Sequence, residues 1–108
     1  MDENTINTAF DLINHARKDL LKASDNQAEA RKVLDEKKIK VFADGLIDGK
    51  NETERKAQYA LYTAEEEKKV EEKERLYAMT QMSFDLANYE VNRVKLLVQF
   101  LSLSQGEK

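Results

Sequence analysis

Residues 4–43 read NTINTAFDLINHARKDLLKASDNQAEARKVLDEKKIKVFA, and a seven-residue repeat runs through this stretch. The first position of the repeat carries large side chains with one polar exception, and the position three residues later carries alanine in the first four repeats. The two sets are Ile6, Ile13, Leu20, Gln27, Leu34 and Val41, and Ala9, Ala16, Ala23 and Ala30. Such a repeat predicts a helix, over about residues 4–43, that packs along one face against a second helix at close range.

A glycine-containing turn is expected over residues 44–51. Gly45 and Gly49 lie there, and either could adopt the left-handed conformation that ends a helix. Asn51 suits the N-cap of a second helix, with Glu54 three residues later in a capping-box-like arrangement. The second helix is therefore predicted over about residues 52–102. The whole chain, residues 1–108, is expected to be one all-α domain, an antiparallel two-helix hairpin of long coiled-coil-like helices that assembles into a helical bundle oligomer.

The position of the turn predicts which side chains of the two helices meet. Centring it near residues 47–48 places Leu34 opposite Leu61, Leu20 opposite Leu76, Ile13 opposite Met82 and Ile6 opposite Tyr89. The same register sets Ala16 against Met79 and Ala9 against Leu86, so that large side chains face small ones, as close packing requires. One alternative stays open, because Ser24-Asp25-Asn26 is a run of poor helix formers at which the first helix could break.

The second helix carries more apolar surface than one partner helix can cover. A further stripe with seven-residue spacing lies on another face, and beyond residue 90 apolar residues surround the helix almost completely. A helix that is apolar on more than one face must be buried on more than one side. We therefore expect a homo-oligomer, dimer or higher, with a monomer whose tail folds back as the alternative. The predicted interface residues are Val91, Val94, Leu97, Val98, Phe100 and Leu101, and the further stripe is Val70, Tyr77, Phe84, Val91 and Val98.

The sequence offers no converging catalytic or metal-binding constellation. There is no cysteine, and the single histidine, His15, has only Asp11 near it on the same helix face. Glu71 and Glu74 could form one carboxylate pair of a magnesium-dependent hydrolase, but the facing stretch lacks a matching pair. We expect no enzymatic activity, no metal and no cofactor. The start of the chain lacks a signal peptide pattern and no segment is apolar enough to span a membrane, which predicts a cytoplasmic protein.

One end of the predicted hairpin is a candidate partner surface. Its residues combine bases with tyrosines, which are common in contact surfaces. They are Arg31, Lys38, Arg55, Tyr59 and Tyr62. A protein partner is the first hypothesis, and nucleic acid is the alternative. The net charge of −3, with acids and bases evenly mixed, gives nucleic acid little support.

The run GKNETERKAQ at residues 49–58, the Glu/Lys-rich helix after it and YEVNRVKLL at residues 89–97 resemble small helical proteins from phages and prophages of Gram-positive bacteria. The shared features are chain length, an N-E-x-x-R-x-A motif after a glycine-containing turn and a leucine-rich closing helix. The family implies no enzymatic activity. The resemblance suggests an accessory role, beside phage recombination or replication or against host defence, in the cytoplasm of the bacterial host.

Overall fold

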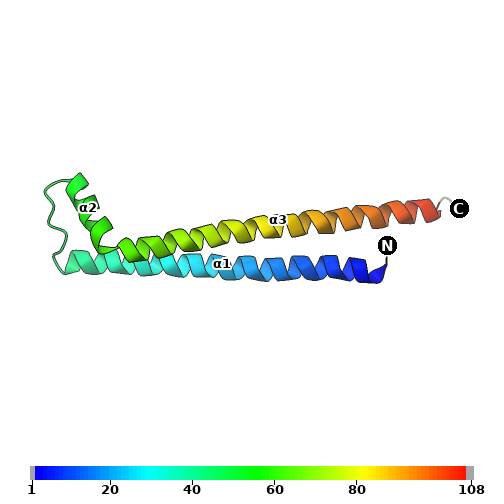
Figure 1. Cartoon of the computed structure of the whole chain (residues 1–108), viewed down its shortest axis with the longest axis horizontal. Helices are drawn as coiled ribbons and strands as arrows, with labels where there is room; N and C mark the ends of the chain where they lie inside the picture. The colour runs from blue at the N-terminus through cyan, green and yellow to red at the C-terminus, as the bar shows by residue number, and fades with distance from the viewer. Residues whose placement is uncertain (1, 107–108) are drawn as a thin grey trace. The chain divides into compact units, whose positions relative to one another are not determined.

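The computed structural model describes residues 2–106, which form three α-helices (Figure 1). Helix α1 spans Glu3–Ala43, α2 spans Glu52–Tyr62 and α3 spans Ala64–Gly106. No strand occurs within the described residues, so the all-α prediction is confirmed. Helix α1 continues without a break through residues 24–26. The single second helix predicted over residues 52–102 is corrected, because the chain forms two helices there.

Thr63 divides α2 from α3. Its backbone N–H and its hydroxyl both donate to the carbonyl oxygen of Tyr59, at 2.9 and 2.7 Å, and so close the last turn of α2. Its φ and ψ of −117° and 18° are not helical, and its own carbonyl accepts from the N–H of Glu67 at the start of α3. The residue is fully buried, and each of these polar groups has a partner. A threonine hydroxyl competes for backbone groups in this way, but it is a much weaker sequence signal than proline or glycine.

The end of α1 confirms the predicted role of a glycine. Gly45 has a φ of +74°, the left-handed conformation that costs glycine little. The N–H of Gly45 donates to the Phe42 carbonyl, and the N–H of Leu46 donates to the Val41 carbonyl, both at 3.1 Å. These are the two hydrogen bonds of a Schellman motif, which satisfies carbonyls that the helix end leaves without partners.

The connection from α1 then docks on the first turns of α2. Asn51 caps α2 by accepting from the N–H of Glu54 at 2.8 Å, as predicted, while the Glu54 carboxylate accepts from the N–H of Lys50 at 2.7 Å. Gln58 accepts from the N–H of Gly49 at 2.9 Å and donates to the Asp48 carboxylate at 2.5 Å. The helix therefore holds the loop on both sides of Gly49.

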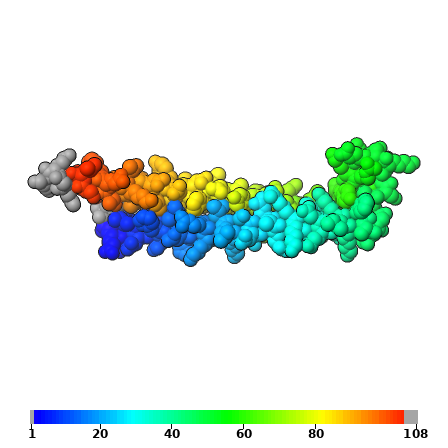
Figure 2. All heavy atoms as spheres, turned by 180° about the vertical axis from the view of Figure 1, so that it is seen from behind, coloured from blue at the N-terminus to red at the C-terminus, as the bar shows by residue number. Residues whose placement is uncertain are grey.

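The chain contains two compact units, each described by itself. Unit 1 comprises the residues up to Lys22 and those from Ala78 onward. Within it, α1 and α3 pack antiparallel, and Figure 2 shows the blue beginning of α1 against the orange and red end of α3. Small and β-branched side chains dominate this core, which lets the helices approach closely. The core consists of Ala9, Ile13, Ala16, Ala87, Val91 and Val94, with Ile6 and Phe84 packed against it.

Unit 2 is Ala23–Tyr77 and contains α2 together with the adjoining parts of α1 and α3. Its buried residues are Ala30, Val41, Thr63 and Val70. Arg31 of α1 donates to the Glu74 carboxylate of α3 at 2.9 Å. Both side chains are about half exposed, so this ion pair contributes at most about 1 kcal/mol.

The contact face of α1 is as predicted, whereas that of α3 is not. All ten heptad residues of α1 named above are buried or half-buried. The expected partners Leu61, Leu76 and Met82 are instead 73%, 49% and 65% exposed. The predicted register is therefore wrong. Its physical cause is the length of the connection, because α3 begins at Ala64 and a different set of its residues meets α1.

The side chains of α3 that turn inward include Val70, Tyr77, Phe84 and Val91 of the further stripe, whereas its last member, Val98, is 37% exposed. We call the inward-facing set the inner stripe; its members are Val70, Tyr77, Phe84, Ala87, Val91 and Val94, all buried or half-buried. Leu86, predicted to face Ala9, is 66% exposed, and Met79, predicted to face Ala16, is 62% exposed. Tyr89, predicted to face Ile6, is 70% exposed. The two faces of α3 have thus exchanged the roles that the sequence suggested.

Candidate interaction surfaces

The described acidic side chains and the single histidine are not clustered around a common point. Within residues 2–106, no group of three or more histidine, aspartate or glutamate side chains is placed to hold a metal ion. His15 is exposed on α1.

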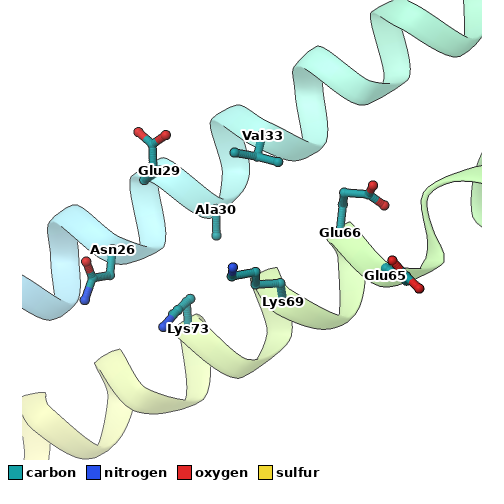
Figure 3. A pocket seen from close by; sticks show the side chains of 8 residues that line it. All are labelled: Asn26, Glu29, Ala30, Val33, Glu65, Glu66, Lys69 and Lys73. Atoms are coloured by element: carbon teal, nitrogen blue, oxygen red, sulfur yellow. The ribbon is translucent and has the colours of Figure 1, made fainter.

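A groove in unit 2, of about 420 Å³, lies between α1 and α3 (Figure 3). Lys69 and Lys73 reach from α3 toward the Ala30 region of α1, whereas Glu29 points away from α3. Glutamates and lysines share the lining, so their charges largely cancel and the groove favours neither cations nor anions. It is lined by Asn26, Glu29, Ala30, Val33, Glu65, Glu66, Lys69 and Lys73.

The five residues of the predicted partner surface all lie in unit 2. Both guanidinium groups make contacts within the chain, because Arg31 pairs with Glu74 and Arg55 donates to the Gly49 carbonyl at 3.1 Å. Lys38 and Tyr59 are half-buried, and Tyr62 is 39% exposed. The two arginines therefore have structural roles in unit 2, which reduces the positive surface available to a phosphate-bearing partner.

The six residues of the predicted oligomer interface fall into two groups. Val91 and Val94 lie in the core of unit 1, where they are 3% and 1% exposed and are covered by α1. The other four lie on the surface. Leu97 and Val98 are each 37% exposed, Leu101 is 41% exposed and Phe100 is 66% exposed. Only these four are open to another chain.

A longer exposed set lies on the face of α3 opposite the inner stripe, and we call it the outer stripe. It follows a heptad pattern from residue 79 to residue 103, with one charged member, Arg93, at 51% side-chain exposure. Its positions are offset by two residues from those of the inner stripe, which is about 200° around a helix. The seven apolar members are between 62% and 70% exposed: Met79, Met82, Leu86, Tyr89, Leu96, Phe100 and Leu103.

Part of the outer stripe, Met79, Met82, Leu86 and Tyr89, is predicted from the sequence to contact α1. Its sequence signal is a pair of heptad patterns two residues apart on one helix. A helix with such a pair has two opposite faces for other helices. This signal is present in the sequence alone.

Arg93 forms an ion pair within the outer face. Its Nε and one terminal nitrogen donate to the two carboxylate oxygens of Glu90, one turn earlier in α3. The hydrogen bond from Arg93 lowers the pKa of Glu90, and the same contact raises the pKa of Arg93. The pair brings no net charge to the outer face, although its burial against another chain would still cost desolvation of both groups.

Comparison with protein-family models, with curated proteins and with solved structures finds no match for this chain. In the part of the chain that the structure describes, no helix has the length and apolarity required to cross a membrane.

Proposed function

We propose that the protein is a non-catalytic, self-associating helical interaction protein. Copies associate through the exposed apolar face of α3 in unit 1, and the assembly binds a further protein. The resemblance to small phage and prophage proteins supports an accessory or inhibitory role in a bacterial host. The observation that carries the proposal is the outer stripe, whose seven apolar side chains are each more than 60% exposed.

The size of this face argues for a protein partner. If each apolar side chain exposes roughly 100 Å², the outer stripe offers about 700 Å², more than the largest patch on a typical monomer. At about 25 cal/mol per Å², its burial on both copies would contribute tens of kcal/mol before the costs of association. Even a small net fraction of that gain is enough for a stable complex.

Light scattering on the full chain tests self-association. We expect a dimer or higher oligomer for the natural sequence and a monomer for Leu96→Glu, because a carboxylate at the centre of the apolar face loses hydration on burial. Asn88→Glu is the matched control, since it adds the same charge at an exposed α3 position outside the outer stripe. A natural chain that stays monomeric at millimolar concentration would refute the proposal.

Nucleic-acid association during phage replication or recombination is the weaker proposal. It depends on the bases of unit 2, of which Arg31 and Arg55 are held within the chain. Electrophoretic mobility shift at low and moderate salt tests it, because phosphate contacts strengthen as salt is lowered. Absence of any shift at low salt would leave protein binding as the function.

A further inference from the structure

The pattern of the outer stripe specifies the kind of surface that covers it. Met79, Leu86, Arg93 and Phe100 recur every seven residues, and a second series at the same interval begins with Met82. Alternate spacings of three and four residues form the holes into which the side chains of another α-helix insert. An irregular loop or a sheet edge would not require this period. The occupant is therefore a helix with a matching heptad.

We infer that this helix is α3 of a second copy, bound antiparallel through the same outer stripe about a two-fold axis near residue 91. The inference rests on the proposed function and specifies its geometry. A two-fold interface uses the same patch on both copies. In this antiparallel register, each residue of the series that begins with Met79 lies opposite a residue of the series that begins with Met82 on the other copy. The layers are Met79 with Leu103, Met82 with Phe100, Leu86 with Leu96, and Tyr89 with Arg93, each occurring twice.

Arg93 sets the orientation. In the antiparallel register its guanidinium lies against the Tyr89 ring of the other copy, a favourable cation–π arrangement. Glu90 accompanies Arg93 in either orientation and therefore does not discriminate between them. A parallel pair would place the two Arg93 side chains in one layer with the Tyr89 rings in another, and would bring the guanidinium groups closer than the roughly 6 Å along the helix axis that separates them in the antiparallel pair. Positions beside the outer stripe carry few charges, so this layer discriminates between the two orientations.

The rest of unit 1 leaves room for this partner. Helix α1 covers the inner stripe, on the opposite face of α3, through Ala9, Ile13 and Ala16. A second α3 would extend the helix packing that the unit already has. The roughly 700 Å² that each copy offers is close to the about 800 Å² per partner of a stable interface. The outer stripe alone therefore suffices for a dimer.

Thiol cross-linking tests the register, because the chain has no cysteine of its own. We would prepare Leu86→Cys and Leu96→Cys in the full chain, separately. Both positions are exposed in the single chain, and circular dichroism checks that each variant folds. Each variant alone and an equilibrated mixture are treated with a short bismaleimide. In the antiparallel register the two position-86 thiols of a dimer are about 15 Å apart along the helix axis. A thiol at position 86 of one copy is instead adjacent to a thiol at position 96 of the other copy.

We expect a covalent dimer in the mixture and a severalfold lower yield from either variant alone. Strong cross-linking of each variant alone, with no gain on mixing, would mean a parallel pair and would overturn the inference while self-association stands. A dimer by light scattering that cross-links in neither case would place the interface elsewhere and also overturn it. A monomer by light scattering would refute the proposed function as well.

Arg93→Leu tests the orientation step separately. Added to Leu86→Cys, it removes the like-charge penalty of the parallel pair, so cross-linking of that variant alone is expected to rise severalfold. Asn88→Leu is the control, because it adds a leucine without changing the Tyr89–Arg93 layer. An unchanged yield with Arg93→Leu would show that another feature orients the dimer and would overturn the role given to Arg93.

Discussion

Replacing Val94 and Leu96 by alanine, one at a time, tests which face of α3 stabilises the single chain. Val94 is 1% exposed in the unit 1 core, and Leu96, two residues later, is 65% exposed. Val94→Ala removes two buried methyl groups, worth about 1.6 kcal/mol by transfer, and leaves a cavity, for a total of about 2–3 kcal/mol. Leu96→Ala is expected to change the free energy of unfolding of the monomer by less than about 0.5 kcal/mol.

Urea unfolding followed by circular dichroism at 222 nm measures both values. The experiment uses two protein concentrations, because association stabilises the folded chain by mass action. The loss for Val94→Ala should be independent of concentration. The loss for Leu96→Ala should be small in dilute solution and should grow as the natural protein associates. If Leu96→Ala is the more damaging variant in dilute solution, the outer stripe faces α1 in the single chain, and the assignment of the inner stripe to that contact is wrong.

Three further predictions concern the loop, the helix break and the ion pair. Gly49→Ala should weaken the docking of the loop on α2 by about 1–2 kcal/mol, because the added Cβ would lie 2.8 Å from the Arg55 backbone nitrogen and 2.9 Å from the Glu54 Cβ. The rate of hydrogen exchange of residues 44–62 should rise, and protection equal to that of the natural chain would contradict the close approach. Thr63→Val should lower the free energy of unfolding in urea by about 1 kcal/mol, because it removes one buried hydrogen bond to Tyr59 with little change in side-chain volume. A stabilised variant would contradict the capping role of the hydroxyl. Arg93→Leu should raise the pKa of Glu90 toward its ordinary value, because the hydrogen bond that lowers it is lost, and NMR of the carboxyl carbon measures the change. Ionised Glu90 stabilises the folded chain above its unfolded pKa, and this contribution is lost as pH falls through the lowered folded-state pKa.

The contact face of α1 could be predicted because only one of its faces carries a regular pattern. Ala9, Ala16 and Ala30 repeat at the same heptad position and are all buried. The larger apolar residues outside this pattern, such as Leu12 and Leu21, are scattered and exposed. Gly45 and Asn51 were equally readable, because a left-handed residue and a helix cap each require particular residue types.

The contact face of α3 could not be chosen from the pattern alone. The inner and outer stripes have the same period, and the outer one carries the larger side chains. Which stripe meets α1 depends on where α3 begins, and therefore on the break at Thr63. At that break the Thr63 hydroxyl donates a hydrogen bond to the Tyr59 carbonyl, and the Thr63 side chain is fully buried. Residue type alone does not reveal burial, so a division of the helix at Thr63 could not be predicted from the sequence.

The division of side chains between the two faces of α3 is itself an argument for association. The core of unit 1 uses mainly alanine and valine from α3, which bury little surface each, with Phe84 packed against it, while larger side chains such as Met82, Leu96 and Phe100 remain outside. Two helices with such a small core gain little against the entropy of ordering the chain. Burying the outer stripe would supply the missing apolar contact, so the stability of unit 1 and its association should rise together. A variant that stays monomeric should therefore also unfold at lower urea than the associated chain.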